Sequence, residues 1–152
     1  MKKNALLMFC LMPLWLCAQT YKMYQTQNYH NQLRLNTATG EVLKVQDDGQ
    51  SWKICSEMEI DGKEDNRFCL YETQNMWTFI MLDSFTGKLW QVQYSTQSRD
   101  DILCVSINDQ VLESGEESIF TIQPMTSMYQ YYLISNKSGA MWKFQWTIKG
   151  PD

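Results

Sequence analysis

Residues 75–93, with the sequence NMWTFIMLDSFTGKLWQVQ, decide the fold of this chain. Trp77, Phe79 and Met81 alternate with side chains that are also largely apolar, which predicts a strand covered on both faces. After a turn that ends at Gly87, the run 88–94 alternates again, with one apolar and one amide-rich face. An Asp that opens a turn and a Gly that closes it are typical of the longer hairpin loops. The stretch therefore predicts a β-hairpin.

The hairpin pattern occurs three times in the chain. The copies align without internal gaps and have repeat cores at residues 21–46, 68–93 and 120–145, offset by 47 (68 − 21) and 52 (120 − 68) residues. Three features recur in register: a polar residue that opens the turn, a glycine that ends it, and a final glutamine. These are Asn36, Asp83 and Ser135; Gly40, Gly87 and Gly139; and Gln46, Gln93 and Gln145. Internal repetition of this kind indicates a stack of supersecondary units.

Each copy contains three strand-like runs, and the connectors between copies contain two shorter ones. We expect strands at 21–25, 30–35 and 41–46, at 68–72, 77–82 and 88–94, and at 120–123, 129–134 and 140–147, with edge strands at 51–55 and 102–107. The expected fold is all-β: three repeated antiparallel units of three to four strands that form one small propeller-like or barrel-like domain. Pro124 interrupts the third copy, so its strand is expected at a sheet edge or at a bulge.

The first copy is the most polar of the three. His30 and Gln32 stand where the second copy has Trp77 and Phe79. A terminal repeat has one neighbour fewer and needs less apolar surface, so this composition predicts a cap. His30 is the only histidine, and its position predicts a partly buried strand residue rather than a catalytic base.

The N-terminus has the features of an export signal. Lys2 and Lys3 precede an apolar run at 5–17 that is too short for a comfortable membrane span. Residues 1–18 are therefore assigned to a signal peptide and 19–152 to the mature domain, which predicts a periplasmic or secreted bacterial protein. Lipidation at Cys17 is the alternative; it normally follows a small residue, whereas Leu16 stands here.

The charge of the mature chain excludes several classes of function. Loss of two lysines with the signal leaves 11 basic and 17 acidic residues, a formal charge of −6 (11 − 17). An acidic chain without a basic run argues against binding to nucleic acid or to an anionic membrane surface. No C-x-x-C motif or Cys/His set indicates a metal site, and no catalytic residues are predicted.

Three cysteines remain after removal of the signal: Cys55, Cys69 and Cys104. Export permits a disulfide, and the odd number leaves one thiol free in any case. Cys55 and Cys69 flank one acidic loop and are the favoured pair, with three unpaired buried thiols as the alternative.

The turn 83–90 and its counterpart 139–144 resemble blade motifs of quinoprotein-type β-propellers, in which an L-D-x-x-T-G-x-x-x-W pattern joins two inner strands. The resemblance covers about fifteen residues per repeat and implies a propeller-like unit. Closed propellers contain four to eight blades, so three copies depart from that family. No quinone-site residues can be mapped, so we infer no cofactor. The wider W-x-F-x-x-L-D-x-x-T-G-K-x-W-Q-V-Q pattern is similar to small exported proteins of Bacteroidota, a resemblance that implies no activity.

Small size, export and the lack of an assembled catalytic set favour a non-enzymatic binding protein. Its expected partner is another protein, in an inhibitor, immunity or surface-interaction role. The alternative is a carbohydrate-binding module that uses the repeated Trp and Gln; a purely structural envelope protein is a third hypothesis. The candidate ligand-binding residues are Gln46, Gln93, Gln145, Tyr129 and Tyr131. Function is expected mainly in the loops that differ between copies.

Overall fold

The computed structural model describes residues 20–60, 62–109 and 119–147, and this part of the chain contains eleven strands and no helix. The signal-peptide and lipidation predictions fall on residues outside the described part. The strands are β1 (Tyr21–Gln25), β2 (Asn31–Asn36), β3 (Val42–Gln46), β4 (Ser51–Cys55), β5 (Phe68–Glu72), β6 (Thr78–Asp83), β7 (Leu89–Gln93), β8 (Leu103–Ser106), β9 (Phe120–Pro124), β10 (Gln130–Ser135) and β11 (Met141–Gln145). Each expected strand is present, with boundaries that differ by up to two residues.

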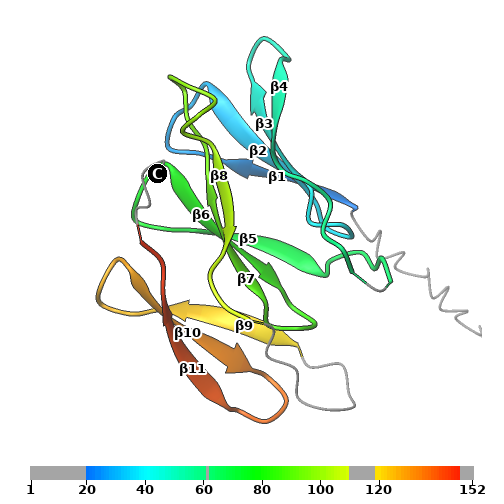
Figure 1. Cartoon of the computed structure of the whole chain (residues 1–152), viewed down its shortest axis with the longest axis vertical. Coiled ribbons are helices and arrows are strands. Elements are labelled where there is room, and N and C mark those ends of the chain that lie inside the picture. The colour runs from blue at the N-terminus through cyan, green and yellow to red at the C-terminus, as the bar shows by residue number, and fades with distance from the viewer. Residues whose placement is uncertain (1–19, 61, 110–118, 148–152) are drawn as a thin grey trace, which may run out of the picture.

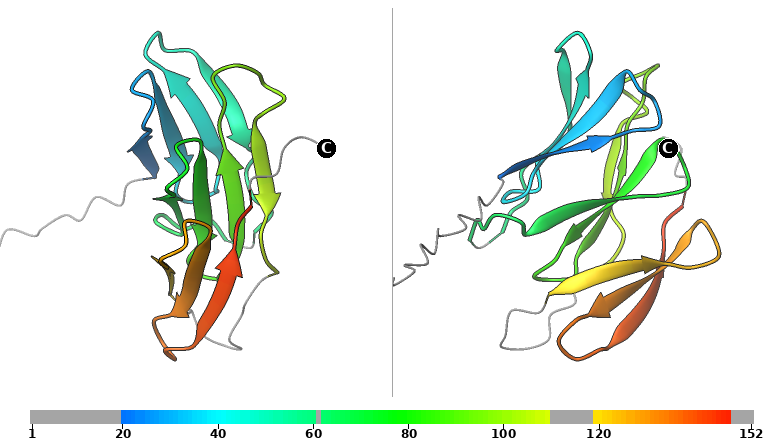
Figure 2. Two further views of the ribbon diagram at one scale, coloured as in Figure 1. Left: turned by 90° about the vertical axis from the view of Figure 1, so that its left-hand side faces the viewer. Right: turned by 180° about the vertical axis from the view of Figure 1, so that it is seen from behind.

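The strands form three separate antiparallel sheets, one for each repeat. Sheet 1 has the order β1-β2-β3-β4, sheet 2 the order β5-β6-β7-β8, and sheet 3 the order β11-β10-β9. The sheets follow one another along the long axis of the molecule, with sheet 2 in the middle (Figures 1 and 2). The all-β prediction is confirmed, and no closed barrel forms among the described residues. Pro124 ends β9, an edge strand, as the sequence predicts.

The three units share one strand register. Tyr21 lies opposite Asn36, Phe68 opposite Asp83, and Phe120 opposite Ser135, as the alignment of the copies requires. In each unit, the turn of the second hairpin ends at an equivalent glycine. The φ angles of these glycines, Gly40, Gly87 and Gly139, are all near +75°. An L-residue is strained at that angle, so the turn selects glycine.

The residue that opens each turn bonds to the backbone within the turn. Asn36 Oδ1 accepts a hydrogen bond from the Ala38 N–H at 3.0 Å, and Asp83 Oδ1 accepts one from the Phe85 N–H at 3.0 Å. Ser135 Oγ accepts one from an N–H in the third turn at 3.2 Å. Each turn therefore contains the local side-chain bond that these residue types typically form.

Two hydrophobic cores hold the three sheets together. The first lies between sheets 1 and 2 and includes Leu33 and Leu35 from β2 and Met81 from β6. The second lies between sheets 2 and 3 and includes Ile80 from β6 and Leu133 from β10. Every residue of β6 is buried, because its alternate side chains enter different cores. The two-sided burial predicted for this strand is confirmed.

A disulfide links the outer strands of sheets 1 and 2. It joins Cys55 at the end of β4 to Cys104 in β8, and Cys69 is the free thiol. The predicted Cys55–Cys69 pair is therefore wrong. β4 and β8 are neighbours across the first core, whereas Cys69 lies on β5, at the opposite edge of sheet 2 from β8. The cross-link fastens the first two units to each other.

Within the described residues, no helix is long and apolar enough to cross a membrane.

Candidate functional site

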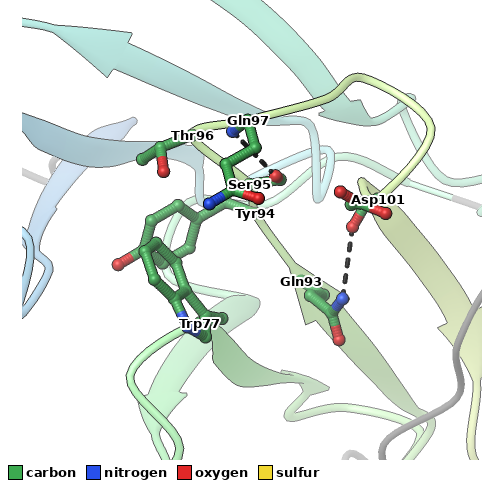
Figure 3. A pocket seen from close by; sticks show the side chains of 7 residues that line it. All are labelled: Trp77, Gln93, Tyr94, Ser95, Thr96, Gln97 and Asp101. Atoms are coloured by element: carbon green, nitrogen blue, oxygen red, sulfur yellow. Dashed lines mark hydrogen bonds between the residues drawn. The ribbon is translucent and has the colours of Figure 1, made fainter.

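The candidate site is a pair of adjoining hollows beside the loop that follows β7. The larger has a volume of about 340 Å³ and the smaller about 220 Å³, and both are open to solvent. They share Ser95, Thr96 and Gln97. The larger is also lined by Lys44, Gln46, Trp52, Ser98, Arg99 and Ile102, and the smaller by Trp77, Gln93, Tyr94 and Asp101 (Figure 3). The site therefore spans units 1 and 2.

The shared loop is held in place by its own serine and by both flanking sheets. Ser95 Oγ accepts hydrogen bonds from the backbone N–H groups of Gln97 and Ser98, at 3.1 and 3.3 Å. Lys44 of β3 donates to the Ser95 carbonyl at 2.8 Å. Gln93 donates from Nε2 to the Asp101 carbonyl at 3.2 Å (Figure 3). These bonds order the loop, and an ordered loop would lose less entropy on binding than a free one.

Lys44 forms part of the wall of the larger hollow. The residue is only 6% exposed, and its Nζ lies 4.4 Å from the centroid of the Trp52 ring. Burial, followed by the nearby positive charge of Arg99, lowers the pKa of Lys44. The larger hollow thus combines two cations with hydroxyl and amide groups.

The smaller hollow has an aromatic wall. The rings of Trp77 and Tyr94 lie 5.3 Å apart and are tilted by 59°. The Tyr94 hydroxyl donates to the Met76 carbonyl at 2.8 Å, and burial raises the pKa of Tyr94. Asp101 and Gln93 supply acceptors and donors opposite these rings (Figure 3). Both hollows can therefore hold polar groups through hydrogen bonds.

The structure separates the five predicted ligand-binding residues. Gln46 lines the larger hollow and Gln93 the smaller, whereas Gln145 is exposed on β11 and lines neither. Tyr131 is 4% exposed and its ring stacks on that of Phe144, so it is not part of an exposed patch. Tyr129 is half-buried, and the centroid of its ring lies 5.1 Å from that of the Trp146 ring. The three repeated glutamines therefore do not line one common groove.

Sequence reasoning did not identify the loop 95–99, Lys44 or Trp52 as parts of a site. The available signal was the run Ser95-Thr96-Gln97-Ser98, a polar segment directly after the best-preserved copy. It lies in a connector, where the copies differ from one another. Its contact with Lys44 joins residues 51 positions apart, which no local pattern could reveal.

His30 lies outside the hollows. Its Nδ1 is 2.8 Å from a carboxylate oxygen of Asp47, and its ring lies 3.9 Å from that of Tyr29 at a tilt of 43°. The His30 side chain is 59% exposed, so the expectation of a partly buried strand residue is wrong: it precedes β2 and lies on an outer surface. Among the described residues, no group of His, Cys, Asp or Glu side chains is arranged to hold a metal ion.

No protein-family model, curated protein or solved structure matches this chain.

Proposed function

We propose that this protein is an exported, non-enzymatic binding protein and that it binds another protein through the two hollows and the loop between them. The observation that carries the proposal is the continuity of the site: two open hollows share one pre-ordered loop. A shallow surface with a few fixed polar groups suits a protein partner, whose side chains can enter both hollows at once. Export to the periplasm or medium, and an inhibitor, immunity or surface-interaction role, belong to the same proposal.

The residue types of the site support a protein ligand. Protein interfaces are enriched in Trp, Tyr and Arg, and the hollows contain Trp52, Trp77, Tyr94 and Arg99. The Lys44 ammonium already lies over one face of the Trp52 ring. An aromatic ring with an occupied face has less surface on which a sugar ring can stack.

A carbohydrate ligand is the second candidate. Gln46 and Gln93, two of the three repeated glutamines, line the hollows together with the hydroxyl groups of Ser95 and Thr96. Amides and hydroxyls in this density can bond to sugar hydroxyl groups. The proposed propeller-like arrangement of the units supports either ligand, because propeller surfaces present the loops between strands.

The test is a pull-down from the native periplasm or culture medium, read by mass spectrometry. Bait proteins carry Gln97→Ala or Arg99→Ala, and Gln145→Ala serves as the matched control because Gln145 is a repeated glutamine outside the hollows. We expect the unchanged protein and the control to capture one partner and the two site variants to lose it. Circular dichroism checks that all variants fold.

A glycan array with the same proteins separates the two candidates. Binding to a defined glycan that is lost in Gln97→Ala, together with an empty pull-down, would replace the protein ligand by a carbohydrate. Equal capture of one partner by the unchanged protein and both site variants would contradict the location of the site.

A further inference from the structure

The units contact each other through a repeated pair of features, an aromatic ring and a glycine. A Cβ atom placed on Gly40 would lie 3.1 Å from the ring of Phe68, and one on Gly87 would lie 3.3 Å from the ring of Phe120. The first aromatic residue of each following unit therefore packs on the turn glycine of the preceding unit. We call this glycine and its turn the glycine socket. The interface between units is thus built twice to the same plan.

A backbone hydrogen bond accompanies each of these contacts. The Phe68 N–H donates to the Thr37 carbonyl at 2.8 Å, and the Phe120 N–H donates to the Ser84 carbonyl, also at 2.8 Å. Thr37 and Ser84 occupy equivalent positions in their turns, directly after the residue that opens the turn. The bond and the ring contact together fix how one sheet sits on the next.

The two end units each retain an unused half of this interface. Tyr21 occupies the position of Phe68 and Phe120, and it is 51% exposed. Gly139 occupies the position of Gly40 and Gly87, yet a Cβ there would meet no heavy atom within 4 Å among the described residues. Within the part of the chain that the structure describes, Tyr21 is therefore an aromatic ring without a socket and Gly139 a socket without a ring.

The sheet face that carries Tyr21 and the sheet face next to Gly139 are equivalent to the two faces that meet in each internal contact between units. The outer face of sheet 1 carries Tyr21, Met23, Gln32, Arg34, Leu43 and Val45, all on the side opposite the first core. The outer face of sheet 3 carries Thr121, Gln123, Tyr132, Ile134, Met141 and Lys143, opposite the second core. Exposed large apolar side chains occur on both faces: Tyr21 (51%), Met23 (44%) and Met141 (54%).

We propose that a second copy of this chain covers these two faces. The outer face of sheet 1 in one copy packs on the outer face of sheet 3 in the other, with Tyr21 in the Gly139 socket. Closed propellers contain four to eight units, and two chains of three give six, whereas three chains give nine. Two head-to-tail contacts in a ring of two chains use both rings and both sockets and leave none exposed.

The composition of the faces predicts a reversible association. Gln32 and Arg34 on the outer face of sheet 1 replace the equivalent Phe79 and Met81 of the internal interface. An interface of this mixed polarity resembles those of proteins that also exist as free monomers. The dimer is therefore expected to dissociate on dilution, as a permanent dimer would not.

The experiment is sedimentation velocity or light scattering of the purified protein across micromolar to sub-millimolar concentrations. We expect a concentration-dependent species of twice the chain mass. Tyr21→Glu and Met141→Arg should each give a monomer, because a charge would enter the contact from either side. Glu59→Arg, at an exposed position in the loop between β4 and β5, is the control and should remain dimeric. Circular dichroism confirms that each variant is folded.

A mixture of the two disruptive variants tests the head-to-tail arrangement. In the mixed dimer, one of the two contacts combines an intact Tyr21 with an intact Met141, so the mixture should recover part of the dimer. A wild-type protein that stays monomeric over the whole range would overturn the proposal. A dimer unaffected by Tyr21→Glu would place the contact elsewhere, and open-ended fibres would exclude the closed ring.

Discussion

Removal of the disulfide is expected to destabilise the protein strongly, because the cross-link closes a long loop. Cys55 and Cys104 are separated by 49 residues. For a closed loop of about 50 residues, chain-entropy theory predicts that the cross-link lowers the entropy of the unfolded chain by roughly 14 cal/mol/K, which corresponds to about 4 kcal/mol at 25 °C. The double substitution Cys55→Ala/Cys104→Ala should therefore lower the free energy of unfolding by an amount of this order. Cys69→Ala, which removes the free thiol, should cost about 1 kcal/mol.

Urea unfolding followed by tryptophan fluorescence measures this loss. With a slope of about 2 kcal/mol/M, the unfolding midpoint of the double variant should fall by about 2 M. Reduction of the unchanged protein should produce a similar fall, and the reductant should have no effect on the double variant. Cys69→Ala should keep its sensitivity to the reductant, because its disulfide is intact.

The outcome for Cys69 decides between the two pairings. If Cys69→Ala removed the sensitivity to reductant, Cys69 would be one of the bonded cysteines and the Cys55–Cys104 pairing would be wrong. A double variant whose midpoint shifted by less than about 0.5 M would refute the entropic argument for the Cys55–Cys104 loop. Peptide mapping of the non-reduced protein identifies the bonded cysteines directly.

Three further substitutions in unit 2 test a buried ion pair, a turn glycine and a buried tyrosine. Asp83→Ala removes the carboxylate that lies 2.7 Å from the buried Arg67 guanidinium, and should lower the free energy of unfolding in urea by about 3–5 kcal/mol. Glu57→Ala breaks an exposed ion pair with Lys63 and should lower it by at most about 1 kcal/mol. Gly87→Ala places a methyl group at a strained φ of +74° and against sheet 3, whereas Gly49→Ala has a φ of +83° and open space around it. The free energy of unfolding should therefore fall by about 1–3 kcal/mol more in Gly87→Ala than in Gly49→Ala. Equal losses would show that the glycine socket tolerates a methyl group. Burial raises the pKa of Tyr71 from 10 to about 12, so its contribution to stability is complete below pH 10 and is lost as pH rises from 10 to 12. Tyr71→Phe should therefore lose less stability than the unchanged protein over that pH range, as measured by urea unfolding at several pH values.

The strands and turns of this protein were predictable from the sequence alone. The runs around Trp77 and Trp90 alternate with a period of two, and that alternation is a property of neighbouring residues. Asp83 and Gly87 likewise specify their turn through a side-chain bond over two residues and through a positive φ. Because these causes act over a few residues, all three copies form the same hairpin.

The sequence predicted the disulfide and the site less well. Cys55 and Cys69 are the closer pair in the sequence, but the edge positions of β4 and β8 bring Cys55 to Cys104. Gln46 and Gln93 were identified through their repetition, yet only the packing of sheet 1 on sheet 2 places them in adjoining hollows. The loop at Ser95, which joins those hollows, has no repeated pattern.

The sequence by itself determined the repeated unit: its strand register, its turn and the two-sided burial of β6. Only the tertiary structure decided which faces meet and which cysteines bond, and that among the described residues the Tyr21 ring and the Gly139 socket have no counterpart. The physical reason is the range of the interactions. Alternation and turn bonds act between neighbours, whereas the contact of Lys44 with Ser95 and that of Gly87 with Phe120 exist only after complete sheets have packed together.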